Sequence, residues 1–133
     1  MKHSVLIIDA NSSRLVRQKN LLSQVGYDIA IAQDATEASA QLRLTCYSMV
    51  IMDLMSPDAD PDDGVSLIRQ VQTLRPGIPI LILTSNTNPA VHRKARSLGV
   101  WDISVKPTPT AELLGLTKGI LEDAYPVRVH LGK

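Results

Sequence analysis

Four apolar runs in this sequence are each followed by a polar residue, and these residues are Asp9, Asp53, Thr84 and Lys106. A carboxylate can act as a nucleophile or bind a cation, while an ammonium or hydroxyl group can hold the oxygens of an anion. Asp53 follows the run SMVIM, and an ionised group at the end of a buried strand must find partners or remain hydrated. Together these residue types indicate a polar site.

Each residue also has an ordinary structural explanation when it is taken alone. Asp9 can cap a helix, Thr84 can satisfy a backbone group, and Lys106 can extend its ammonium into water. Independent structural needs would not place two acids, a hydroxyl and an amine at the same end of four separate strands. The joint pattern therefore favours a functional site over four unrelated structural roles.

The segments that must position these residues alternate between strand-like and helix-like patterns. Five apolar runs have strand length, at residues 4–8, 27–32, 48–52, 78–83 and 101–105, and helical spacing of apolar residues follows each run. Gly26 and Gly99 suit helix exits. This alternation predicts an α/β fold, with a parallel sheet and helices on both faces.

The strand order expected for this sheet is 2-1-3-4-5, which is the order of flavodoxin-like (βα)5 folds. A five-stranded half of a Rossmann fold is the alternative, but the glycine fingerprint G-x-G-x-x-G is absent after the first run, where DANSSR stands. The carboxyl ends of parallel strands face one edge, and ligands bind in the crevice there. Asp9, Asp53, Thr84 and Lys106 are therefore expected to converge.

Length and composition limit the classes of protein that need to be considered. The chain has 133 residues, enough for one domain, and a formal net charge of +1, which does not favour nucleic acid or an anionic membrane. Cys46 is the single cysteine, so an internal disulfide is excluded, and we expect it to be a small buried hydrophobe. No apolar run has the length of a membrane span, which predicts a soluble, cytoplasmic protein.

Residues 4 to about 123 resemble the receiver domain of response regulators, the CheY-like module of two-component signalling. The matching motifs are VLIID, MVIMD, LILTS and VKP. The resemblance implies that Asp53 accepts a phosphoryl group from a sensor histidine kinase or phosphotransfer protein, that Thr84 and Lys106 hold the phosphoryl oxygens, and that Mg²⁺ occupies the pocket. It also implies a signalling module rather than an enzyme, and a cis peptide bond between Lys106 and Pro107.

Two positions depart from the family pattern. The family usually has two adjacent acids after the first strand, but the second position here is Ala10. The expected metal ligands are then Asp9, Asp53 and the carbonyl of Met55, completed by water, so Mg²⁺ binding should be weak. Ile103 stands where the family usually has Tyr or Phe, so coupling between Thr84 and the output face should be weaker or differently built.

The segment after Asp53 is longer than usual for the family and rich in aspartate. Asp58, Asp60 and Asp62 match alternate ligand positions of a calcium loop, but the turn glycine is replaced by Asp63 and the bidentate glutamate by Arg69. These replacements favour a solvated loop over a calcium site, with a water-mediated contact to Mg²⁺ as an alternative role. We expect residues 56–63 to be more mobile than the preceding strand.

Three classes of function remain in competition. The favoured one is a receiver domain, residues 1–124, that switches a protein–protein interaction when Asp53 is phosphorylated, with residues 125–133 as a tail or linker remnant. The alternative is a pseudo-receiver that acts as a constitutive interaction domain because Ala10 and Ile103 disable the switch. A metal-dependent phosphatase is less favoured, because neither a cap domain nor a second catalytic acid is visible.

The surface available to partners is expected to include the fourth helix. VHRKARSLG places His92 and several basic residues on this helix, which indicates a solvated face, with a partner contact as the alternative. A homodimer or an output domain would use the face made by the fourth helix, fifth strand and fifth helix.

Overall fold

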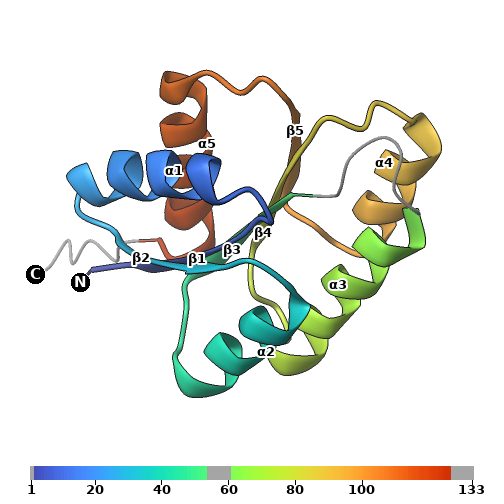
Figure 1. Cartoon of the computed structure of the whole chain (residues 1–133), viewed down its shortest axis with the longest axis horizontal. Helices are drawn as coiled ribbons and strands as arrows, with labels where there is room; N and C mark the ends of the chain where they lie inside the picture. The colour runs from blue at the N-terminus through green and yellow to red at the C-terminus, as the bar shows by residue number, and fades with distance from the viewer. Residues whose placement is uncertain (1, 54–60, 127–133) are drawn as a thin grey trace, which may run out of the picture.

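The computed structural model describes residues 2–53 and 61–126, apart from the side chains of residues 12–15 and 61–63. Five strands alternate with five helices along these residues (Figure 1). The elements are β1 (Ser4–Ile8), α1 (Ser12–Gln24), β2 (Asp28–Ala32), α2 (Ala35–Leu44), β3 (Met49–Asp53), α3 (Pro61–Leu74), β4 (Ile80–Thr84), α4 (Pro89–Ser97), β5 (Asp102–Val105) and α5 (Thr110–Ala124).

The strands form one parallel sheet in the order β2-β1-β3-β4-β5, which confirms the predicted flavodoxin-like topology. Side chains alternate between the two faces of each strand. Leu6 and Ile8 of β1 pack in the cluster that contains residues of α2, α3 and α4, whereas Val5 and Ile7 pack in the cluster with α1 and α5. The helices accordingly lie in two layers, one on each face of the sheet (Figure 1).

Local sequence explains several of the helix ends. The side chain of Asp34 caps α2 by accepting the backbone N–H of Glu37, and Asn88 caps α4 by accepting that of Ala90. Gly26 and Gly99 have φ values of +100° and +89°, a conformation in which a Cβ is unfavourable, so both mark helix exits as predicted.

Two local expectations are wrong. Cys46 is exposed rather than buried, because it lies in the connection that follows the C-cap of α2 at Thr45, before β3 begins. The helix α3 begins at Pro61, so the last three residues of the expected loop 56–63 are helical. Residues 54–60 lie outside the described part of the chain. The prediction that this segment is mobile therefore falls on residues that the structure does not describe.

The amino-terminal edge of the sheet is tied to the residue that follows α5. The Tyr125 hydroxyl donates to the backbone carbonyl of Ser48 at 2.7 Å, and the ring of Tyr125 lies 5.4 Å from that of His3, centroid to centroid. His3 Nδ1 in turn lies 2.9 Å from the hydroxyl oxygen of Ser48. Partial burial raises the pKa of Tyr125, because the ionised phenolate is disfavoured away from water.

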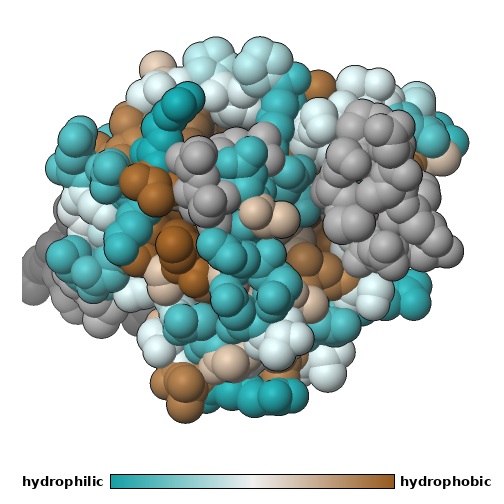
Figure 2. Space-filling model, viewed as in Figure 1, coloured by the Kyte–Doolittle hydropathy of each residue, from teal (hydrophilic) through white to brown (hydrophobic). Residues whose placement is uncertain are grey.

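The face seen in Figure 2 is largely hydrophilic, with hydrophobic side chains in separate small patches. None of the described helices is long and apolar enough to cross a membrane. The apolar surface is instead concentrated between the sheet and the helices, where Leu6 is fully buried.

Replacing Leu6 by Ala should lower the free energy of unfolding by about 2–5 kcal/mol, because the truncation removes buried methyl groups and leaves a cavity. Leu44→Ala is the matched control. Its side chain is 84% exposed at the end of α2, and its loss should change stability by about 0.5 kcal/mol or less. Urea denaturation followed by circular dichroism measures both values, and equal losses would contradict the assignment of the core.

Candidate functional site

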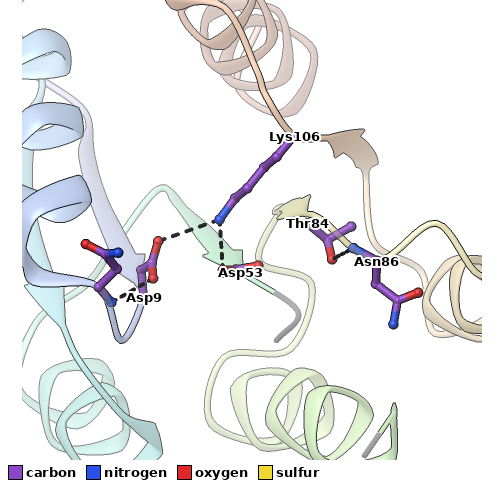
Figure 3. A network of polar contacts seen from close by, with 6 residues as sticks. Asp9, Asp53, Thr84, Asn86 and Lys106 are labelled. Carbon is purple, nitrogen blue, oxygen red and sulfur yellow. Dashed lines mark hydrogen bonds and ion pairs between the residues drawn. The ribbon is translucent and has the colours of Figure 1, made fainter. Parts of the chain in front are cut away.

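The four predicted site residues all lie at the carboxyl edge of the sheet. Asp9 follows β1, Asp53 is the last residue of β3, Thr84 is the last residue of β4, and Lys106 follows β5. Figure 3 shows the Lys106 side chain reaching across from the end of β5 toward Asp53 and Asp9. The convergence expected from the parallel topology is therefore present.

One ammonium group joins the two carboxylates. Lys106 Nζ donates to Asp53 Oδ2 at 2.8 Å and lies 3.9 Å from Asp9 Oδ2. The Lys106 and Asp53 side chains are only 13% and 16% exposed, and that of Asp9 only 5%. Limited hydration strengthens the attraction between these charges. Two carboxylates and one ammonium leave one negative charge in excess among the three side chains, which suits an additional cation.

Asp9 is also fixed by the chain that follows it. Its Oδ1 accepts the backbone N–H of Asn11 at 2.9 Å, just before α1 begins. From the sequence, helix capping is the structural alternative for Asp9. The structure shows a contact at the start of α1 and the contact to Lys106 together. Asp9 Oδ1 faces the start of α1, while Oδ2 faces the ammonium, so the carboxylate is held in one orientation.

Thr84 joins the site through both its backbone and its hydroxyl group. The Lys106 backbone N–H donates to the Thr84 carbonyl at 2.7 Å, which sets the two strand ends side by side. Thr84 is fully buried, and its Oγ1 accepts the backbone N–H of Asn86 at 3.0 Å. Thr84 therefore lies beside the ion pair and is linked to the loop that leads into α4.

Sequence reasoning missed Asn86, a buried polar residue in that loop. Its side-chain oxygen accepts the backbone N–H of Asn88 at 2.8 Å, and its backbone carbonyl lies 2.6 Å from His92 Nε2. A carbonyl oxygen only accepts, so Nε2 carries the proton of this hydrogen bond. The sequence offers one signal near this residue, because Asn88 immediately before Pro89 is a pattern typical of a helix start. That pattern predicts where α4 begins, but it does not predict the hydrogen bonds of Asn86.

The donor set for a metal consists of two carboxylates in the described part of the chain. Asp9 and Asp53 both contact the same ammonium group, and both present the hard oxygen atoms that Mg²⁺ prefers. Residues 2–53 and 61–126 contain no group of three or more His, Cys, Asp or Glu side chains that could hold a metal ion. The third predicted ligand, Met55, lies outside these residues, as do Asp58 and Asp60.

Two further predictions concern β5 and the residues that follow it. The Lys106-Pro107 peptide bond is cis, as predicted. Ile103 of β5 is partly buried and packs against the apolar cluster that lies under α2, α3 and α4. Its side chain is thus used for packing and offers no hydrogen-bonding group.

Comparison with known proteins assigns most of this chain to one family. Residues 5–118 match the family model of the response regulator receiver domain. The transcriptional regulatory protein ZraR of Salmonella typhimurium is 29% identical over 106 residues, which cover 80% of this chain and 23% of that protein. A protein-glutamate methylesterase/protein-glutamine glutaminase of Anaeromyxobacter dehalogenans is 36% identical over 113 residues, with 82% of this chain and 32% of that protein covered.

A solved structure supports the fold independently. The receiver domain protein (CheY-like) from Methanospirillum hungatei JF-1 superposes with a TM-score of 0.84 at 24% sequence identity. The match covers 93% of this chain and 97% of that one. By contrast, this chain spans only 23% and 32% of the lengths of the two curated relatives, so most of each relative has no counterpart in the comparison.

Replacing Lys106 by Met should lower the free energy of unfolding at pH 7 by about 1–3 kcal/mol, because two poorly hydrated carboxylates then lose a shared cation. Lys118→Met is the control, since its ion pair with Glu122 is mostly exposed and should contribute about 0.5 kcal/mol or less. Urea titration at pH 7 compares the two variants. If the losses are equal, the ammonium does not offset the two carboxylates.

Proposed function

Because the chain belongs to the response-regulator receiver domain family, we propose that it switches a protein–protein interaction when Asp53 accepts a phosphoryl group from a sensor histidine kinase or phosphotransfer protein. The observation that carries this proposal is the 2.8 Å contact of Lys106 with Asp53, beside Asp9 and the buried Thr84. Receiver domains in general are signalling modules rather than enzymes, and we infer the same for this chain.

The proposed chemistry assigns one task to each residue. An Asp53 carboxylate oxygen attacks the phosphorus atom, a new P–O bond forms, and the P–N bond of the phosphohistidine breaks with the imidazole as leaving group. Lys106 already contacts the carboxylate and would remain close to the phosphoryl oxygens. The Thr84 hydroxyl accepts the backbone N–H of Asn86. Because a hydroxyl group is also a donor, we assign it the task of donating to a phosphoryl oxygen. The contribution of these residues is mainly positioning and charge stabilisation.

Mg²⁺ fits the residues present, although a second acid is missing at position 10. Asp9 and Asp53 would hold the ion together with water and the carbonyl of Met55, since Mg²⁺ usually keeps several waters. When bound, the ion offsets the repulsion between the carboxylate and the incoming phosphoryl group. Ala10 is exposed in the connection between β1 and α1, and its methyl side chain offers no ligand atom.

The donor and the output partner would use different surfaces. A pocket of about 470 Å³ opens beside Lys106 between α1 and α5, with Arg17, Gln18 and Leu21 on one side and Thr110 and Leu113 on the other. Its position favours this side for the approach of the phosphohistidine donor. Trp101 and Val105 are exposed near or on β5, which supports the face of α4, β5 and α5 as the contact for an output domain or a second copy of the chain.

Asp53→Asn should abolish the gain in mass that acetyl phosphate and Mg²⁺ produce, because the amide cannot form the acyl phosphate. Intact-protein mass spectrometry before and after mild acid or hydroxylamine treatment measures the labile group. Asp28→Asn is the control, since this exposed carboxylate at the start of β2 pairs with Lys2 far from the site. Labelling that survives Asp53→Asn contradicts the acceptor assignment, and an unlabelled wild-type protein supports a pseudo-receiver.

Ala10→Asp should tighten Mg²⁺ binding by at least tenfold, about 1.4 kcal/mol, because it restores a direct carboxylate to the site. Phosphorylation by acetyl phosphate should rise in parallel when Mg²⁺ is limiting. Calorimetric titration with Mg²⁺ measures the affinity.

Ala40→Asp is the matched control, because it adds the same charge to an exposed position on α2. If Asp58→Asn or Asp60→Asn weakens binding while Ala10→Asp changes little, the aspartate-rich segment supplies the missing ligand instead.

A further inference from the structure

Asn86 is held by three hydrogen bonds that come from both ends of the loop joining β4 to α4. Its backbone N–H donates to Thr84 Oγ1 at 3.0 Å, its side-chain oxygen accepts from the Asn88 backbone at 2.8 Å, and its carbonyl accepts from His92 Nε2 at 2.6 Å. Asn86 is also buried, with 9% of its surface exposed. Its position therefore depends on Thr84 at one end and on α4 at the other.

Both contacts on the helix side belong to the first turn of α4. Asn88 is the N-cap of this helix, and the His92 backbone N–H donates to the Asn88 carbonyl at 3.2 Å. The His92 ring folds back from this turn to reach the Asn86 carbonyl, so the ring is partly buried rather than fully solvated. The interpretation of His92 as part of a solvated face is thus incomplete, because the side chain serves the loop that carries the Thr84 contact.

We propose that His92 is a positioning residue for Thr84 and that it couples phosphorylation of Asp53 to the position of α4. The inference rests on the proposed function, because it requires a phosphoryl group on Asp53. When the Thr84 hydroxyl turns toward a phosphoryl oxygen, it moves relative to the Asn86 N–H, and Asn86 shifts with the loop. The hydrogen bond between His92 and the Asn86 carbonyl then lengthens, which frees the first turn of α4 to rearrange.

This coupling differs from one built on an aromatic side chain in β5. Ile103 has no polar group and packs against the apolar cluster, whereas His92 joins the Thr84 loop to α4 directly. Because coupling between two sites is reciprocal, a bond that favours the unphosphorylated arrangement must also oppose phosphorylation. Loss of the His92 side chain should therefore make phosphorylation of Asp53 more favourable. It should also make the position of α4 less dependent on phosphorylation.

The test compares His92→Leu, which removes the donor, with His92→Gln, whose side-chain amide can donate to the same carbonyl. Each protein is incubated with Mg²⁺ and a fixed concentration of acetyl phosphate. Intact mass then gives the ratio of phosphorylated to unphosphorylated protein. That ratio should rise about two- to tenfold in His92→Leu, the range expected for one hydrogen bond, and return to within about twofold of the wild type in His92→Gln.

A second measurement reports on the bond itself. The ¹⁵N resonance of the His92 ring and the backbone amide resonances of Ala90 and Ala95 should all shift when the wild-type protein is phosphorylated, and the amide shifts should shrink in His92→Leu. Arg93→Leu is the control, because it removes an exposed cation from the same helix and should change neither readout.

The outcomes separate the coupling from the proposed function. If the wild type gains mass but the His92 resonance does not move and His92→Leu keeps the wild-type ratio, the coupling is wrong and the acceptor role stands. If His92→Gln behaves like His92→Leu, the hydrogen bond is not the relevant contact and the coupling is again wrong. Failure of the wild type to gain mass overturns both proposals together.

Discussion

The common direction of the strands is the constraint on which the whole site depends. Four short polar segments, far apart in the sequence, meet only because parallel strands end at the same edge. The strand order adds a second condition: β3 lies between β1 and β4, so Asp53 is flanked by Asp9 on one side and Thr84 on the other. Lys106 then reaches Asp53 past the end of β4, while its backbone N–H remains bonded to Thr84.

The apolar strands make this edge a suitable place for charge. Residues 49–52 of β3 are buried, so Asp53 emerges from a region that cannot hydrate a carboxylate well. The ammonium of Lys106 offsets part of that cost, and the remaining negative charge favours a cation. The ionic contacts are therefore better understood as holding charge at this edge than as a net gain in the stability of the fold.

Most of the fold could be predicted because hydrophobic periodicity and strand-end residues are local properties of the sequence. Strand bounds differ from the expected ones by at most two residues, for example at Ile80, which follows a proline that cannot donate to a ladder. The four site residues could be named from their place after apolar runs. Their convergence followed from topology, although the roles given to them remain proposals.

What could not be predicted depends on how loops fold in three dimensions. The contact between His92 and the Asn86 carbonyl joins residues six positions apart, and no periodic pattern indicates that a helix side chain turns back onto the loop before it. The exposure of Cys46 was missed for a related reason, because apolar character alone does not place a residue inside or outside a connection. The start of α3 at Pro61 was obscured by neighbouring aspartates that resemble turn residues.

The tie between Tyr125 and Ser48 has an architectural consequence. It fastens the end of α5 to the amino-terminal edge of the sheet, whereas the polar site occupies the opposite edge. A strand of five residues spans about 17 Å, so Tyr125 lies well away from the carboxylates of Asp9 and Asp53. The contact that holds the end of α5 and the ion pair of Lys106 are consequently insulated from each other by the length of the sheet, so a change in one can leave the geometry of the other intact.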